Sequence, residues 1–118
     1  MITLDGKNII ISSLATDIDQ AGLGTVSATN PNESDTGLNS NTNLGTPAAT
    51  IKAVSNDTSD KQIAFSYTLL STEGTATTYK EFGLSSTGTD KLFNRQVFYD
   101  LYHGDTDEID ITQVISIR

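Results

Sequence analysis

The sequence contains no cysteine and no tryptophan, and only one histidine, one methionine and two prolines among its 118 residues. Without cysteine the protein forms no disulfide, no thiolate metal site and no thiol nucleophile. A single histidine excludes paired-histidine metal motifs, and the chain also lacks a phosphate-binding glycine loop and a Gly-x-Ser-x-Gly nucleophile turn. We therefore expect that the protein is not an enzyme, with no catalytic residues and no cofactor.

Basic residues are also scarce. Seven Lys and Arg oppose fifteen Asp and Glu, which gives a formal net charge of −8. An acidic chain without a Lys/Arg cluster is repelled by phosphate backbones and by anionic membrane surfaces. The opening residues MITLDGK lack the basic and apolar regions of a signal peptide, and no run approaches the roughly 20 apolar residues of a transmembrane helix. We expect no nucleic-acid partner, no membrane partner and synthesis in a cytoplasm without export.

The abundant residue types, Ser, Thr, Asn, Gly and Asp, favour strands and turns over helices. The clearest strand signal lies at the end of the chain, where apolar and polar residues alternate with a period of two. One face carries Ile109, Ile111, Gln113, Ile115 and Ile117, and the other carries Asp110, Thr112, Ser116 and Arg118. This alternation predicts a half-buried strand that begins at about residue 108.

Similar signals precede this segment. Ile63, Phe65, Tyr67 and Leu69 alternate with polar or small residues, and shorter strand signals lie at 17–25, 49–54, 82–84 and 92–98. Turns are expected at 55–60 and 85–90, and loops at 71–78 and 100–107. Short strands joined by such turns predict one domain, 1–118, that is all-β: an antiparallel β-sandwich of the jelly-roll or immunoglobulin-like type. The three C-terminal segments are expected to form a meander.

Two segments depart from this strand pattern. Residues 5–15 favour a short helix capped by Asp5, with an apolar side of Ile9, Ile10, Leu14 and Ile2, although the β-branched run 9–11 is equally compatible with a strand. Residues 26–46 are poor in apolar side chains and predict a long irregular loop. A loop of this length is either a partner-binding segment or a flexible surface segment.

The order of several short motifs resembles a small β-domain of tail-associated structural proteins in tailed bacteriophages and related archaeal viruses. Residues 6–10 (GKNII) resemble the opening helix of that family. Residues 21–25 (AGLGT), followed by Pro31 and 34–38 (SDTGL), resemble its glycine motif and the loop that follows. Val26 stands where the family has a further glycine, which changes the geometry expected of that turn.

The C-terminal third continues the resemblance with 81–84 (EFGL), 92–95 (LFNR), Phe98 and the strand over 107–117. The resemblance implies a structural protein of a phage-like virion in the tail, baseplate, collar or tail fibre. Such a protein acts as a homo-oligomer and through contacts with other virion proteins, and it is made in the host cytoplasm. The alternatives are a capsid decoration or turret protein and a calcium-dependent carbohydrate-binding module, against which the absence of tryptophan counts.

Calcium would require several oxygen ligands, and two segments offer carboxylates two residues apart. Asp105 and Asp107 lie in one segment, near Glu108 and Asp110, whereas Asp17 and Asp19 form the other and would converge on an extended backbone. Neither group has the spacing of an EF-hand, and acidic loops usually serve as solvated turns. We therefore predict no metal site.

His103, the single histidine, lies between a tyrosine and a glycine and could pair with Asp105 or Asp107. A lone histidine in a polar loop is typical of a surface residue rather than of a general base. The nearby Tyr99, Leu101 and Tyr102 are candidates for a protein interface, because tyrosine offers a large contact area at low entropic cost. The alternative is that they close the end of the core.

Arg95 is a further interface candidate. It is one of two arginines and sits in the middle of a predicted strand. It could form an ion pair with Glu81 within the sheet, since opposite charges on neighbouring strands attract, or a salt bridge between subunits. The sequence does not separate these two interpretations.

Overall fold

The computed structural model describes residues 1–25, 30–38, 50–87 and 91–118. Within these ranges, helix α1, Leu4–Asp17, is followed by seven strands. Thr3 caps the helix, since its side-chain oxygen accepts a hydrogen bond of 3.0 Å from the backbone N–H of Gly6. The predicted helix is confirmed, but the predicted cap is wrong: Asp5 lies inside the first turn, where its carboxylate faces the positive end of the helix dipole.

The buried face of α1 also differs from the prediction. Ile11 is buried with Leu14 and Ala15 beside it, whereas Ile9 is 67% exposed and Ile2 and Ile10 also face solvent. Asn8 accounts for this orientation, because its Oδ1 accepts a 2.9 Å hydrogen bond from the backbone N–H of Lys61. This contact turns the helix positions three and seven residues after Asn8 toward the core.

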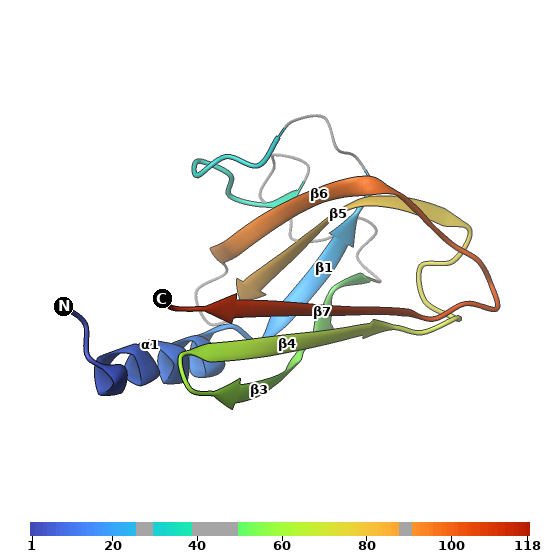
Figure 1. Cartoon of the computed structure of the whole chain (residues 1–118). Coiled ribbons are helices and arrows are strands. Elements are labelled where there is room, and N and C mark those ends of the chain that lie inside the picture. The colour runs from blue at the N-terminus through green and yellow to red at the C-terminus, as the bar shows by residue number, and fades with distance from the viewer. Residues whose placement is uncertain (26–29, 39–49, 88–90) are drawn as a thin grey trace.

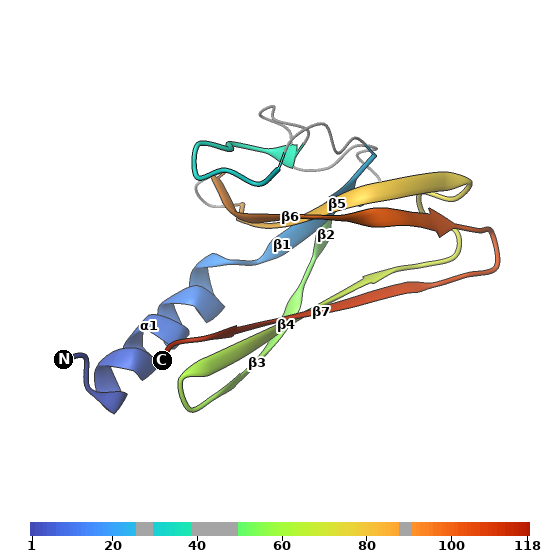
Figure 2. The same ribbon diagram turned by 45° about the horizontal axis from the view of Figure 1, so that its top comes forward.

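Two antiparallel sheets form the body of the protein (Figures 1 and 2). The first has the order β2-β1-β5-β6, with bounds Lys52–Ala53, Gln20–Gly24, Thr77–Ser86 and Lys91–His103. The second has the order β3-β4-β7, with bounds Ser55–Ser59, Gln62–Leu69 and Ile109–Ser116. The predicted all-β antiparallel sandwich with an N-terminal helix is therefore confirmed.

The core lies between the sheets and follows the alternation read from the sequence. The four inward residues of β4, Ile63, Phe65, Tyr67 and Leu69, are buried, and Ile109 of β7 is buried beside them. The rings of Tyr67 and Phe82 join the two sheets edge to face, with centroids 5.3 Å apart. The other inward isoleucines of β7 are only partly buried, because β7 is the outermost strand of its sheet.

Two predicted boundaries and one predicted strand order are wrong. Residues 55–59 form strand β3 rather than a turn; the turn is confined to Asp60 and Lys61, where Lys61 has φ of +61°. Strand β6 continues through the predicted loop to His103, because its last residues pair with the start of β5. The predicted meander also fails, since β7 crosses to the second sheet and pairs with β4 along eight residues.

Residues 30–38 cover the first sheet on the side away from the second sheet (Figure 2). Leu38 is fully buried there, and a side chain added at Gly83 of β5 would come within 2.9 Å of it. The five consecutive residues from Glu81 to Ser85 are consequently all buried. Within the predicted loop 26–46, residues 30–38 form neither a regular helix nor a strand, and 26–29 and 39–46 lie outside the described residues.

Candidate functional site

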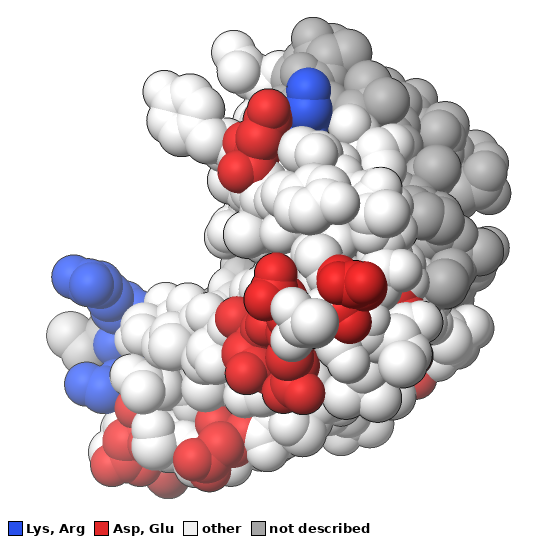
Figure 3. Space-filling view, turned by 90° about the vertical axis from the view of Figure 1, so that its right-hand side faces the viewer, with Lys and Arg blue, Asp and Glu red and all other residues white. Residues whose placement is uncertain are grey.

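Two strand edges on one side of the sandwich lack a neighbour among the described residues. Strand β6 pairs with β5 alone, and β7 pairs with β4 alone. Both edges lie on the same side of the molecule (Figures 1 and 2), and the space-filling view shows the surface hollowed between the two layers (Figure 3). An unpaired edge presents backbone N–H and C=O groups that another strand can pair with.

Strand β6 also carries exposed aromatic side chains. Tyr99 is 97% exposed and Tyr102 is 62% exposed. Phe93 is partly exposed and lies beside the covering segment, residues 30–38. Leu101, in contrast, packs against the core. Of the aromatic segment predicted as an interface, the two tyrosines are therefore accessible to a partner and Leu101 contributes to folding.

Arg95 is directed into its own chain. Its Nε donates to Glu81 Oε2 over 2.7 Å, and its Nη1 lies 3.2 Å from Asp35 Oδ2. The side chain of Arg95 is 2% exposed and that of Glu81 is 0% exposed. The ion pair that sequence suggested within the sheet is present. The contribution of Asp35 was missed, because that residue lies 60 positions away in the covering segment.

The same buried cluster explains a glycine in β1. Glu81 Oε1 is buried and has no hydrogen-bond partner. A Cβ atom at Gly24 would lie 2.4 Å from this oxygen, so only glycine leaves room for the carboxyl group. Gly24 ends strand β1, within the strand predicted at 17–25, and its lack of a side chain is required for close packing against Glu81.

His103 is buried rather than on the surface. Its Nε2 lies 2.8 Å from the backbone oxygen of Asp107 and its Nδ1 lies 3.3 Å from that of Gly74. Tyr79 donates its hydroxyl to the same Gly74 oxygen over 2.5 Å. The histidine therefore joins the loop before β5 to the loop before β7, and its observed contact with Asp107 is to the backbone.

The carboxylates considered for calcium have separate roles. Asp17 ends helix α1, so the extended backbone that would align it with Asp19 is absent. Asp19 accepts hydrogen bonds from the backbone and hydroxyl of Thr87, which hold the pKa of Asp19 below its usual value of 3.8. Asp110 accepts from the Thr68 hydroxyl over 2.7 Å.

Asp105 and Asp107 lie in the exposed loop between β6 and β7, at the end of the sandwich where acidic side chains gather (Figure 3). Within the described ranges, no three Asp, Glu, His or Cys residues are placed to hold a metal ion. No helix in the described part of the chain is long and apolar enough to cross a membrane.

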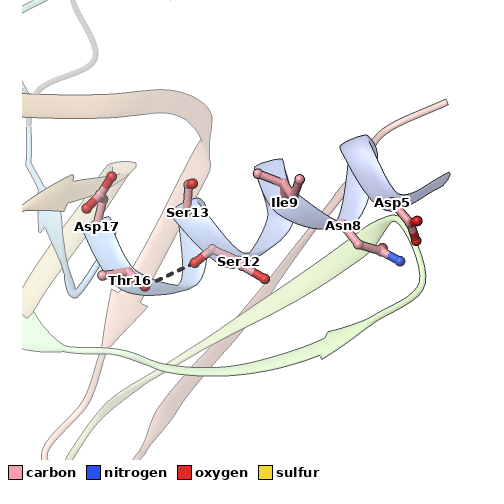
Figure 4. Close-up of a pocket in the computed structure, with 7 residues that line it drawn as sticks. All are labelled: Asp5, Asn8, Ile9, Ser12, Ser13, Thr16 and Asp17. Atoms are coloured by element: carbon pink, nitrogen blue, oxygen red, sulfur yellow. Dashed lines mark hydrogen bonds between the residues drawn. The ribbon is translucent and has the colours of Figure 1, made fainter. Parts of the chain in front are cut away.

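Two shallow hollows lie elsewhere. One follows the outer side of α1 and is lined by Asp5, Asn8, Ile9, Ser12, Ser13, Thr16 and Asp17 (Figure 4). The other lies beside the covering segment and is lined by Pro31, Asn32, Glu33, Asp35, Leu92, Phe93 and Arg95. In the first, the Thr16 hydroxyl donates to the backbone of Ser12. Of the described residues that line the second, Arg95 is the one cation, and it already binds two carboxylates.

No family model, curated protein or solved structure matches this chain. The strongest candidate site is consequently the one built by the fold itself: the open side formed by the edges of β6 and β7 with Tyr99 and Tyr102. We call this side the open edge surface.

Proposed function

We propose that this protein is a non-enzymatic structural component of a phage-like virion, which assembles in the tail, baseplate, collar or fibre through contacts with its own copies and with other virion proteins. The observation that carries the proposal is the open edge surface. Soluble proteins usually protect long edge strands from pairing. Among the described residues, two edges on one side have no strand neighbour, and the longer one carries a tyrosine that is 97% exposed.

The buried polar side chains support a structural role rather than a catalytic one. Arg95 and Glu81 bind each other, and His103 contacts the backbone of two loops. Catalysis needs such groups in a pocket where a substrate can reach them. In this protein they hold the covering segment and the loops in place.

Tyrosine at an exposed strand edge favours recognition of another protein. Its ring supplies a large apolar area, its hydroxyl supplies a hydrogen bond, and ordering it costs little entropy. A capsid decoration protein would use the same surface on a different part of the particle. The order of sequence motifs favours the tail, and the location of the chain decides between the two.

The decisive experiment is to locate this chain in the density of an intact particle. We expect it in the tail or baseplate, with Tyr99 and Tyr102 in contact with a neighbouring subunit. Location on the capsid lattice, away from the portal axis, would contradict the tail assignment and favour the decoration protein.

A matched pair of variants tests the role of the surface. Tyr99→Ser should reduce incorporation into particles, whereas Thr58→Ala, on the exposed strand β3, should not. Equal incorporation of both variants would argue against the open edge surface as the site of assembly.

A further inference from the structure

The outward side of β7 carries a pattern that is complementary to itself. Its exposed residues begin with an acid and end with a base: Asp110, Thr112, Val114, Ser116 and Arg118. Val114, at the centre, is 53% exposed. An antiparallel strand that runs past β7 with the same sequence would therefore meet opposite charges at both ends and an apolar side chain in the middle.

We infer that two copies of this chain pair through β7, antiparallel, about a twofold axis at Val114. This inference rests on the proposed function and names the partner of the open edge surface. On the outward face, Asp110 lies opposite the partner's Arg118, Thr112 opposite the partner's Ser116, and Val114 opposite the partner's Val114. The joined sheet has six strands in the order β3-β4-β7-β7-β4-β3.

The alternation of the strand and its charges select this register. A twofold axis at any β7 residue keeps outward residues opposite outward residues, because side chains alternate with a period of two. An axis at Gln113 would place Asp110 opposite the partner's Ser116, and an axis at Thr112 would place it opposite the partner's Val114. Of these three, the axis at Val114 is the one that pairs both charges.

The inner face of β7 also shows that a neighbour is missing. Ile111, Ile115 and Ile117 are only partly buried although they pack against the core. A second β7 extends this inner face and gives the isoleucines further apolar neighbours, with Ile111 opposite the partner's Ile117 and the partner's Ile115 opposite Gln113.

Charge has two opposing effects on this pairing. Two copies that each carry −8 repel one another at a distance. The exposed Asp110–Arg118 pairs contribute little affinity, as is usual for surface ion pairs, but they set the register. Affinity comes from the backbone hydrogen bonds and from burial of the isoleucines and Val114.

Because β6 lies on the same side as β7, the axis also turns the β6 edges of the two copies toward each other.

The absence of cysteine makes the register directly testable. In antiparallel strands, directly opposed Cα atoms are about 4.5–5.5 Å apart, which is within the range that a disulfide spans. Val114→Cys should therefore form a covalent dimer under mild oxidation. Thr112→Cys should not link to itself, because the two copies of residue 112 are offset by four residues, roughly 13 Å. A mixture of Thr112→Cys and Ser116→Cys should give the mixed dimer.

Charge exchange provides an independent test in the protein without cysteine. Arg118→Asp should weaken the dimer roughly tenfold, since it turns two attractive contacts into repulsive ones. Adding Asp110→Arg should restore the affinity, as measured by light scattering across a concentration series. Thermal unfolding of each variant separates a loss of pairing from a loss of folding.

The outcomes distinguish this inference from the proposed function. The β7 register is overturned if Val114→Cys forms no disulfide-linked dimer. It is also overturned if Thr112→Cys forms a dimer with itself as readily as Val114→Cys does. If the protein still oligomerises in that case, assembly through β6 remains and the proposed function stands. A chain that stays monomeric at high concentration and is absent from particles overturns both.

Discussion

Arg95 and Glu81 form an ion pair of 2.7 Å between neighbouring strands, and both side chains are removed from water. Asp35 lies on the other side of the guanidinium, at 3.2 Å. One arginine thus holds two carboxyl groups and fastens the covering segment to the first sheet. Removing the arginine leaves the buried Glu81 and the largely shielded Asp35 without their cation.

Arg95→Ala should therefore lower the free energy of unfolding by about 3–5 kcal/mol. Lys80→Ala is the matched control, because Lys80 forms a solvent-exposed pair with Asp100 at 3.6 Å in the same sheet, and its loss should cost at most about 1 kcal/mol. Denaturant unfolding measures both values. Similar losses for the two variants would show that burial does not set the strength of the Arg95 contacts.

Gly24→Ala should destabilise the protein by about 1–3 kcal/mol through overpacking. The added methyl would lie 2.4 Å from Glu81 Oε1, and Arg95 prevents that carboxyl group from moving away. Gly104→Ala provides the comparison, since its methyl would meet the exposed side chain of Asp107, which can rotate. Melting temperatures of the two variants test this difference. A larger loss at Gly104 would contradict it.

Ile111→Asp should cost about 2–4 kcal/mol, because it introduces an unpaired charge on the inner face of β7. Thr112 faces solvent, so Thr112→Asp should change the free energy of unfolding by at most about 0.5 kcal/mol. Thermal and denaturant unfolding of the two variants compare the faces directly. Equal tolerance of both substitutions would overturn the assignment of the faces.

The hydrogen bonds from Thr87 that lower the pKa of Asp19 make a contribution to stability that depends on pH. Because the folded pKa lies below the unfolded value, this contribution is present above the ordinary Asp pKa of 3.8 and is lost as pH falls through the folded pKa. Asp19→Asn should therefore reduce the fall in melting temperature that the parent protein shows as pH drops below the ordinary Asp pKa of 3.8. Asp17→Asn, at the end of α1, is the control, and an unchanged pH profile in Asp19→Asn would refute the prediction.

Elements that bury one regular face could be predicted from sequence, and elements without such a face could not. Ile63 to Leu69 and Ile109 to Ile117 revealed β4 and β7 because their apolar side chains alternate. Strand β3 left no such signal, since all five of its residues are exposed and it is held by backbone pairing with β4 and by a hydrogen bond from Asn56 to the backbone of α1. Helix α1 was found but misoriented, because a hydrogen bond from a distant turn to Asn8 sets its rotation.

Of the candidate site, sequence suggested the Arg95–Glu81 pair and the accessible Tyr99 and Tyr102. It placed Tyr102 in a loop and ended the strand before Tyr99, because the irregular register between β5 and β6 interrupts the alternation expected of a strand. The contact with Asp35 and the burial of His103 depend on segments that meet only after folding. The unpaired edges are a property of strand order, which local patterns do not specify.

The covering segment makes the two sheets unequal. Strand β5 is flanked by β1 and β6 and covered on both faces from Glu81 to Ser85, whereas every residue of β3 faces water. Amide hydrogens exchange with solvent only when their part of the structure opens, so those of β5 should be the slowest to take up deuterium and those of β3 among the fastest. Among the described strands, we therefore expect the most persistent backbone hydrogen bonds in β5, which lies beneath the Arg95 cluster and next to the edge strand β6.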